Sequence, residues 1–237
     1  MPGFKTHITG STILGIGYGG AAYFAYGVPS QWPTYALAAG LCSVSGMMPD
    51  IDSDSSTPQR ESMAFASAVV PMMLVHRFLH MGMTHEMILL AGAAVYLLIR
   101  FGAAALLRMY TVHRGMFHSI PAALVFGEVA FLLASGDTLY LRLFVAAAVT
   151  LGYLSHLVLD EIWSVEWAHG PHLKKSFGTA LKLFGDGAWS NVSCYAKLLI
   201  LTALILFVPQ LPDSSQPGIG HSNQQTASRL IDRIWQR

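Results

Sequence analysis

The chain has 237 residues, of which 53% are hydrophobic and 11% are charged, whereas soluble domains carry about 25% charged residues. Its mean hydropathy is +0.48 and its formal net charge is +1. These values indicate an integral membrane protein and argue against nucleic-acid binding, which needs a basic stripe or tail. The two cysteines, Cys42 and Cys194, form no CxxC pair, so neither a thiolate zinc site nor a disulfide framework is expected.

Apolar runs and short polar segments alternate along the chain. A polar lead that holds Lys5 and His7 comes first, and we expect no cleavable signal peptide. The second and seventh runs are short for the roughly 20 residues that a membrane span needs, and Pro71 predicts a kink in the third. The apolar runs cover about residues 11–28, 34–48, 63–79, 87–107, 120–134, 141–159 and 198–208.

This pattern predicts an all-α fold, a polytopic membrane protein with six to seven transmembrane helices in antiparallel hairpins. Residues 1–208 form one membrane-embedded domain, and residues 209–237 form a polar C-terminal tail. Within the domain, residues 161–196 mix tryptophans with lysines, which is typical of a segment that lies at the membrane interface. The expected partner of the whole domain is therefore the lipid bilayer.

The residues that can carry chemistry fall in four polar stretches. Residues 113–119, with the sequence HRGMFHS, hold two histidines and an arginine directly before an apolar helix. The others are His7, the PDID sequence at 49–52, and His156 with Asp160. The last two residues are spaced i, i+4 and so share one helix face. Each stretch could also have a purely structural role, such as a helix cap or an interfacial histidine with a snorkelling arginine.

A count of crossings predicts that these stretches meet. If each run crosses the membrane once, an even number of crossings separates each stretch from the next, so all four lie on the same side. That side carries most of the lysine and arginine residues, which are enriched in cytoplasmic loops. We therefore expect the site at the cytoplasmic face of the membrane.

Together the four stretches offer seven side chains that could bind metal. This number is too large for one tetrahedral zinc ion, which takes four ligands. Seven imidazole and carboxylate groups suit two divalent ions, Zn or Mn or Fe, with one carboxylate bridging. Arg114 would clamp an anionic substrate rather than bind metal, and Ser119 and Ser155 are candidates for a supporting role. The predicted metal ligands are His7, Asp50, Asp52, His113, His118, His156 and Asp160.

These motifs resemble those of the YdjM-like family, over about residues 3–165. The resemblance rests on His7, PDID, HRGxxHS and His156 with Asp160. It implies a LexA-regulated, membrane-bound, metal-dependent hydrolase, distantly related to zinc phospholipase C and P1 nuclease. The long stretch between Asp52 and His113 and the segment after Asp160 depart from the family pattern.

Three functions remain open from the sequence. The first is hydrolysis of a phosphoester, which could come from a lipid, by a water that a di-metal site activates. The second is transport or sensing of a metal ion, although transport sites usually lie near the middle of the bilayer. The third is a structural membrane protein with a metal staple.

Overall fold

The computed structural model describes residues 3–26, 32–52, 56–103, 116–134, 138–166, 172–173, 178 and 180–207. Within these residues the fold is helical, as predicted, except for a two-residue antiparallel pair of strands, β1 (Val165–Glu166) and β2 (His172–Leu173). A short 3-10 helix, η2 (Met48–Asp52), and a π-helical segment, η3 (Leu98–Ala103), complete the architecture. The α-helices are α1 (Phe4–Tyr26), α2 (Trp32–Ser45), α3 (Ser56–His80), α4 (His85–Leu97), α6 (Ile120–Leu133), α7 (Leu139–Trp163) and α8 (Ala188–Phe207).

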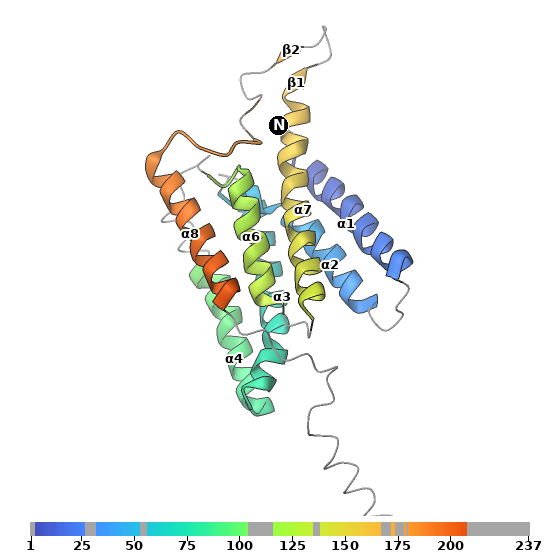
Figure 1. Ribbon diagram of the computed structural model, residues 1–237, viewed down its shortest axis with the longest axis vertical. Helices are drawn as coiled ribbons and strands as arrows, with labels where there is room; N and C mark the ends of the chain where they lie inside the picture. Colours follow the sequence, from blue (N-terminus) through green and yellow to red (C-terminus); the bar gives the residue numbers. More distant parts are fainter. Residues whose placement is uncertain are drawn as a thin grey trace, which may run out of the picture.

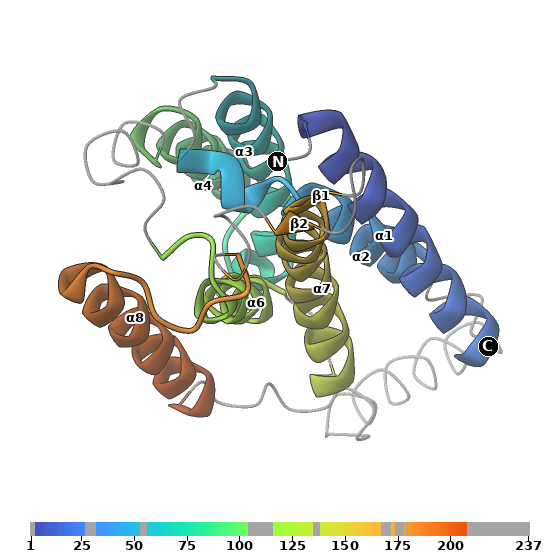
Figure 2. The same ribbon diagram turned by 90° about the horizontal axis from the view of Figure 1, so that it is seen from above.

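Helix α7 lies at the centre of the bundle. It packs against α1, α2 and α6, while α1 also packs along α2 (Figure 2). On the far side of α6 lies α8, and α3 pairs with α4 at another edge. The central position explains why α7 carries buried side chains along its whole length, including Tyr153 and Leu157.

Four helices are long and apolar enough to cross a membrane: Gln59–His80, His85–Gly102, Leu139–Trp163 and Ala188–Phe207. The apolar helix α6 is shorter. Large apolar side chains are exposed on the outer helices, such as Leu89 on α4 and Phe207 on α8. Contiguous exposed apolar surface of this kind marks contact with a membrane, so these helices would contact the lipid bilayer.

Three helices begin well before their predicted apolar runs. Helix α3 begins at Ser56 rather than near residue 63. Helix α1 begins at Phe4, so His7 lies in its first turn rather than in a polar lead. Helix α8 has 20 residues and begins at Ala188, so residues 188–196 lie inside this apolar helix and not in an interfacial segment. The polar groups of its first turns bond locally: Asn191 exchanges hydrogen bonds of 2.7 and 2.8 Å with Gly185.

A glycine lets the central helix approach its neighbour closely. A Cβ atom at Gly152 of α7 would lie 2.0 Å from the carbonyl oxygen of Cys42 on α2. The two helix backbones can therefore touch only where residue 152 has no side chain. This contact lies one turn before His156, so it also sets where that histidine stands relative to the end of α2.

We expect Gly152→Ala to lower the thermal midpoint of unfolding in detergent by about 5 °C, because overpacking a buried contact costs about 1–3 kcal/mol. The matched control is Gly40→Ala on α2, where an added Cβ meets nothing within 4 Å. Equal midpoints for the two variants would show that the α2–α7 contact is not close.

Candidate metal centre

Five of the seven predicted ligands converge at one end of the bundle. His7 comes from the start of α1 and Asp50 from η2, which follows α2. His118 directly precedes the cap of α6, and His156 and Asp160 stand near the end of α7. In Figure 1 this is the end at which α7 leads into β1. The predicted meeting of the four stretches is confirmed for these residues.

His156 is held with one ring nitrogen facing the cluster. Its side chain is fully buried, and Nδ1 lies 2.7 Å from the carbonyl oxygen of Gly46. Because a carbonyl can only accept, Nδ1 carries the hydrogen, and in the neutral ring Nε2 presents a lone pair. That lone pair faces carboxylate oxygens of Asp160 at 3.4 Å and Asp50 at 3.6 Å. Two acceptors and a lone pair repel one another unless a proton or cation lies between them.

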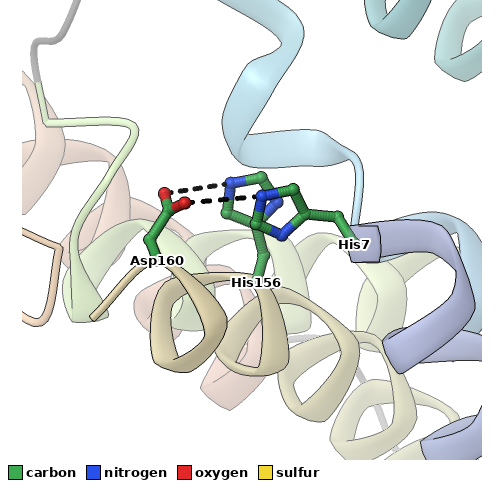
Figure 3. Close-up of side chains that lie close together, drawn as sticks. All are labelled: His7, His156 and Asp160. Atoms are coloured by element: carbon green, nitrogen blue, oxygen red, sulfur yellow. Dashed lines mark ion pairs between the residues drawn. The ribbon is translucent and has the colours of Figure 1, made fainter. Parts of the chain in front are cut away.

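The most buried part of the cluster is shown in Figure 3. The rings of His7 and His156 stack with their centroids 3.6 Å apart and their planes 13° from parallel. Each ring turns a nitrogen toward a different oxygen of Asp160, whose side chain is 3% exposed: His7 Nε2 lies 3.4 Å from Oδ1. The two rings and the Asp160 carboxylate thus converge in one buried space, with their nitrogen and oxygen atoms facing one another.

Asp50 and His118 form the more open side. Their side chains are 28% and 14% exposed, and His118 Nε2 lies 3.5 Å from Asp50 Oδ1 and 3.8 Å from Asp160 Oδ2. Burial raises the pKa of the Asp50 carboxyl, but His118, His156 and His7 together outweigh this effect, so its pKa is lowered. Asp50 is therefore a carboxylate at neutral pH, on the side from which a ligand can approach.

Three predicted residues have no described side chain. Asp52 lies in η2, but its side chain is outside the described part of the structure, and His113 and Arg114 lie entirely outside it. The two serines bond to the backbone: Ser119 caps α6, accepting a hydrogen bond from Ala122 N at 3.3 Å, and Ser155 donates to the Gly152 carbonyl at 2.6 Å. Neither serine has a hydrogen bond to the cluster in the described structure.

Two supporting contacts are missing from the sequence-based prediction. The Gly46 carbonyl fixes the His156 ring, and the Tyr153 hydroxyl donates a hydrogen bond to the carbonyl of Phe117, next to His118. The supporting role of Tyr153 could have been predicted from the sequence, because this residue lies three positions before His156 on α7 and so near the same face. A backbone carbonyl leaves no signal in a sequence.

The donor atoms fit a metal ion better than they fit one another. The N···O separations of 3.4–3.8 Å exceed the 2.7–3.2 Å of a hydrogen bond. They approach the spacing of ligand atoms around a tetrahedral zinc with bonds of 2.0–2.1 Å, which is about 3.3 Å. Among the described residues, His156 Nε2 and Asp160 Oδ1 are buried without a hydrogen-bond partner, and each such atom costs about 1–3 kcal/mol.

Two overlapping groups of possible ligands emerge. His7, His156 and Asp160 form one, and Asp50, His118 and His156 form the other. Imidazole and carboxylate groups without thiolates suit Zn, Mn or Fe. The Gly46 bond to Nδ1 is the kind of outer contact that orients metal-binding histidines.

The fold and this cluster together define a helical membrane protein with buried histidine and aspartate side chains at one end of the bundle. A family model described as "YdjM inner membrane protein" matches residues 1–209. The chain belongs to this family, as the sequence motifs indicated. No curated protein and no solved structure matches the chain.

Proposed function

We propose that this inner membrane protein is a metal-dependent hydrolase that cleaves a phosphoester. The observation that carries the proposal is the set of N···O separations of 3.4–3.8 Å among three imidazoles and two carboxylates. These groups are too far apart to satisfy one another and spaced to share a cation. A divalent ion held there would polarise a phosphoryl oxygen and lower the pKa of a water to about 7.

Asp160 could hold metal through both of its carboxylate oxygens, because they face different imidazoles. Its Oδ2 faces His118 and His156, at 3.8 and 3.4 Å, whereas its Oδ1 faces His7 at 3.4 Å. The two oxygens therefore serve two different positions. His7 and Oδ1 supply only part of a second ligand set, and Asp52 and His113 stay predicted ligands from the sequence.

The buried residues of the cluster and the more exposed ones would have different roles. His7, His156 and Asp160 are buried and fix the geometry of the site. Asp50 is charged and lies with His118 on the open side, where it would hold the ion that an approaching substrate meets. Arg114 stays our candidate for binding the charged phosphate oxygens, since a guanidinium pairs with two of them at once.

The placement of the cluster favours hydrolysis over transport. All five groups lie at or near helix ends, whereas transport sites usually lie near the middle of the bilayer on broken helices. We further propose that α1, α2 and α6 also cross the membrane, which gives the six to seven predicted spans in hairpins. The site then faces the cytoplasm, the side on which lysine and arginine are enriched.

The proposal is tested with the purified protein, bis(4-nitrophenyl) phosphate and added Zn²⁺, Mn²⁺ or Fe²⁺. We expect metal-dependent cleavage, and we expect His118→Ala to lower kcat/KM by at least about 100-fold, because loss of a ligand exceeds the 10–100-fold effect of an outer contact.

The matched control is His85→Ala, an exposed histidine at the other end of α3 and α4, which should cleave at the wild-type rate. Ion flux in proteoliposomes without cleavage would support a transporter instead. Bound metal with neither activity would support a structural staple.

A further inference from the structure

An apolar cavity of about 320 Å³ lies between α3 and the helices α2, α6 and α7. Typical ligand pockets hold about 300–1,000 Å³. Among the described residues that line it, Ser45 alone has a polar side chain, and its hydroxyl already donates to the Cys42 carbonyl at 3.0 Å. The cavity therefore offers no partner for a polar or charged ligand. It suits a hydrocarbon chain.

One end of the cavity is lined by residues that neighbour the metal centre in the sequence. Ile51, which follows Asp50, and Phe117, which precedes His118, both line it. These are the neighbours of the two ligands on the open side of the cluster. Ile51 also packs in one apolar cluster with Met63 of α3 and with Phe117. The apolar cluster therefore separates Asp50 and His118 from the cavity by a single layer of side chains.

The cavity runs away from the centre into the bundle. Met63 and Met73 of α3 both line it, and ten residues of helix span about 15 Å. This is about half of the roughly 30 Å hydrocarbon core of a bilayer. The depth matches the acyl chain of a lipid in one leaflet, with its headgroup at the membrane face where the centre lies.

The packing of α3 leaves a way in from the membrane. Helix α3 pairs with α4 and with η2, but it has only slight contact with α6 (Figure 2). The central helices pack far more closely, as α7 does with α2 and α6. We therefore expect a lipid chain to enter between α3 and α6, where the walls of the cavity pack least closely.

We infer that the substrate is a lipid phosphoester, with its phosphate at the metal centre and one acyl chain in this cavity. The inference rests on the proposed function, and it adds the class of substrate and the place of its tail. The charged end is recognised by the open side of the cluster. The tail is recognised by the apolar walls of α2, α3, α6 and α7.

The direct test uses the protein in lipid nanodiscs and a photoreactive probe, hexadecyl phosphate with a diazirine at the end of the chain. Met73, Leu133 and Val149 line the cavity farthest from the centre along their helices. We expect the probe to label these residues, as mapped by mass spectrometry. Labelling only of outward-facing residues, such as Leu89 or Phe207, would overturn the inference.

A pair of variants on α3 tests whether the walls of the cavity control the labelling. Ala66 lines the cavity, whereas Ala68 on the same helix is exposed and does not. We expect Ala66→Phe to reduce labelling of Met73 and Leu133 about tenfold, because the larger side chain fills part of the cavity. A tenfold change corresponds to about 1.4 kcal/mol, within the cost of overpacking an apolar site. Ala68→Phe should label as the wild type does. Equal labelling of the two variants would contradict the assignment.

The labelling result is separate from the test of hydrolysis. Cavity labelling without any cleavage of phosphoesters would retain the lipid site and overturn the proposed enzyme. Cleavage of bis(4-nitrophenyl) phosphate with labelling confined to outer surfaces would retain the enzyme and overturn the lipid site.

Discussion

Asp160→Asn is expected to weaken the binding of Zn²⁺ or Mn²⁺ by more than about 100-fold, since even outer contacts of a metal site are worth 10–100-fold. Asp160 stands within 3.4–3.8 Å of three imidazoles. An asparagine keeps the size of the side chain but removes its charge, and its amide nitrogen cannot bind a metal. The affinity is measured by competition with a fluorescent metal indicator in detergent.

The matched control is Glu161→Gln, the next residue along α7. Its carboxylate accepts a hydrogen bond from the Gly178 backbone rather than facing the cluster. This variant should bind metal as tightly as the wild type. If Asp160→Asn and Glu161→Gln bind equally well, the buried carboxylate is not a ligand.

Removing bound metal is expected to lower the thermal midpoint by about 10 °C. A ligand at 1,000 times its dissociation constant stabilises the folded state by about 4 kcal/mol, and each kcal/mol shifts the midpoint of a chain of this size by about 2–4 °C. Without a cation, the Asp50 and Asp160 carboxylates face the lone pair of His156. The measurement is a thermal unfolding curve with and without EDTA.

The same treatment should shift the midpoint of Asp160→Asn much less, because that variant binds metal more weakly and gains less stability from it. Readdition of metal should restore the wild-type midpoint. A wild-type curve that EDTA leaves unchanged, in protein shown to contain metal, would mean that the cluster does not stabilise the fold through an ion.

The helical class and the order of the helices follow from hydropathy, but the starts of α1, α3 and α8 do not. The first turns of α8 hold Ser190, Asn191 and Ser193, which lower the local hydropathy although they bond within or near the helix. Helix α1 begins before its apolar run, so His7 joins the cluster from a helix. At the start of α8 local hydrogen bonds, which a hydropathy average does not register, support the helix.

The composition of the site was predictable because it depends on topology. The alternation of apolar runs predicted that His7, Asp50, His118 and Asp160 lie on one side, and their side chains meet at one end of the bundle. The support from the Gly46 carbonyl and the depth of the apolar cavity were not predictable. Both depend on how closely α2, α3 and α7 approach one another, and contacts between distant segments leave no local pattern.

The metal content of the purified full-length protein tests the central claim most directly. The protein is loaded separately with Zn²⁺, Mn²⁺ and Fe²⁺, dialysed, and analysed by mass spectrometry of the metals, beside Asp160→Asn. We predict on the order of one to two retained ions per chain in the wild type and none in the variant. No retained ion with any of the three metals would contradict the proposed metal centre.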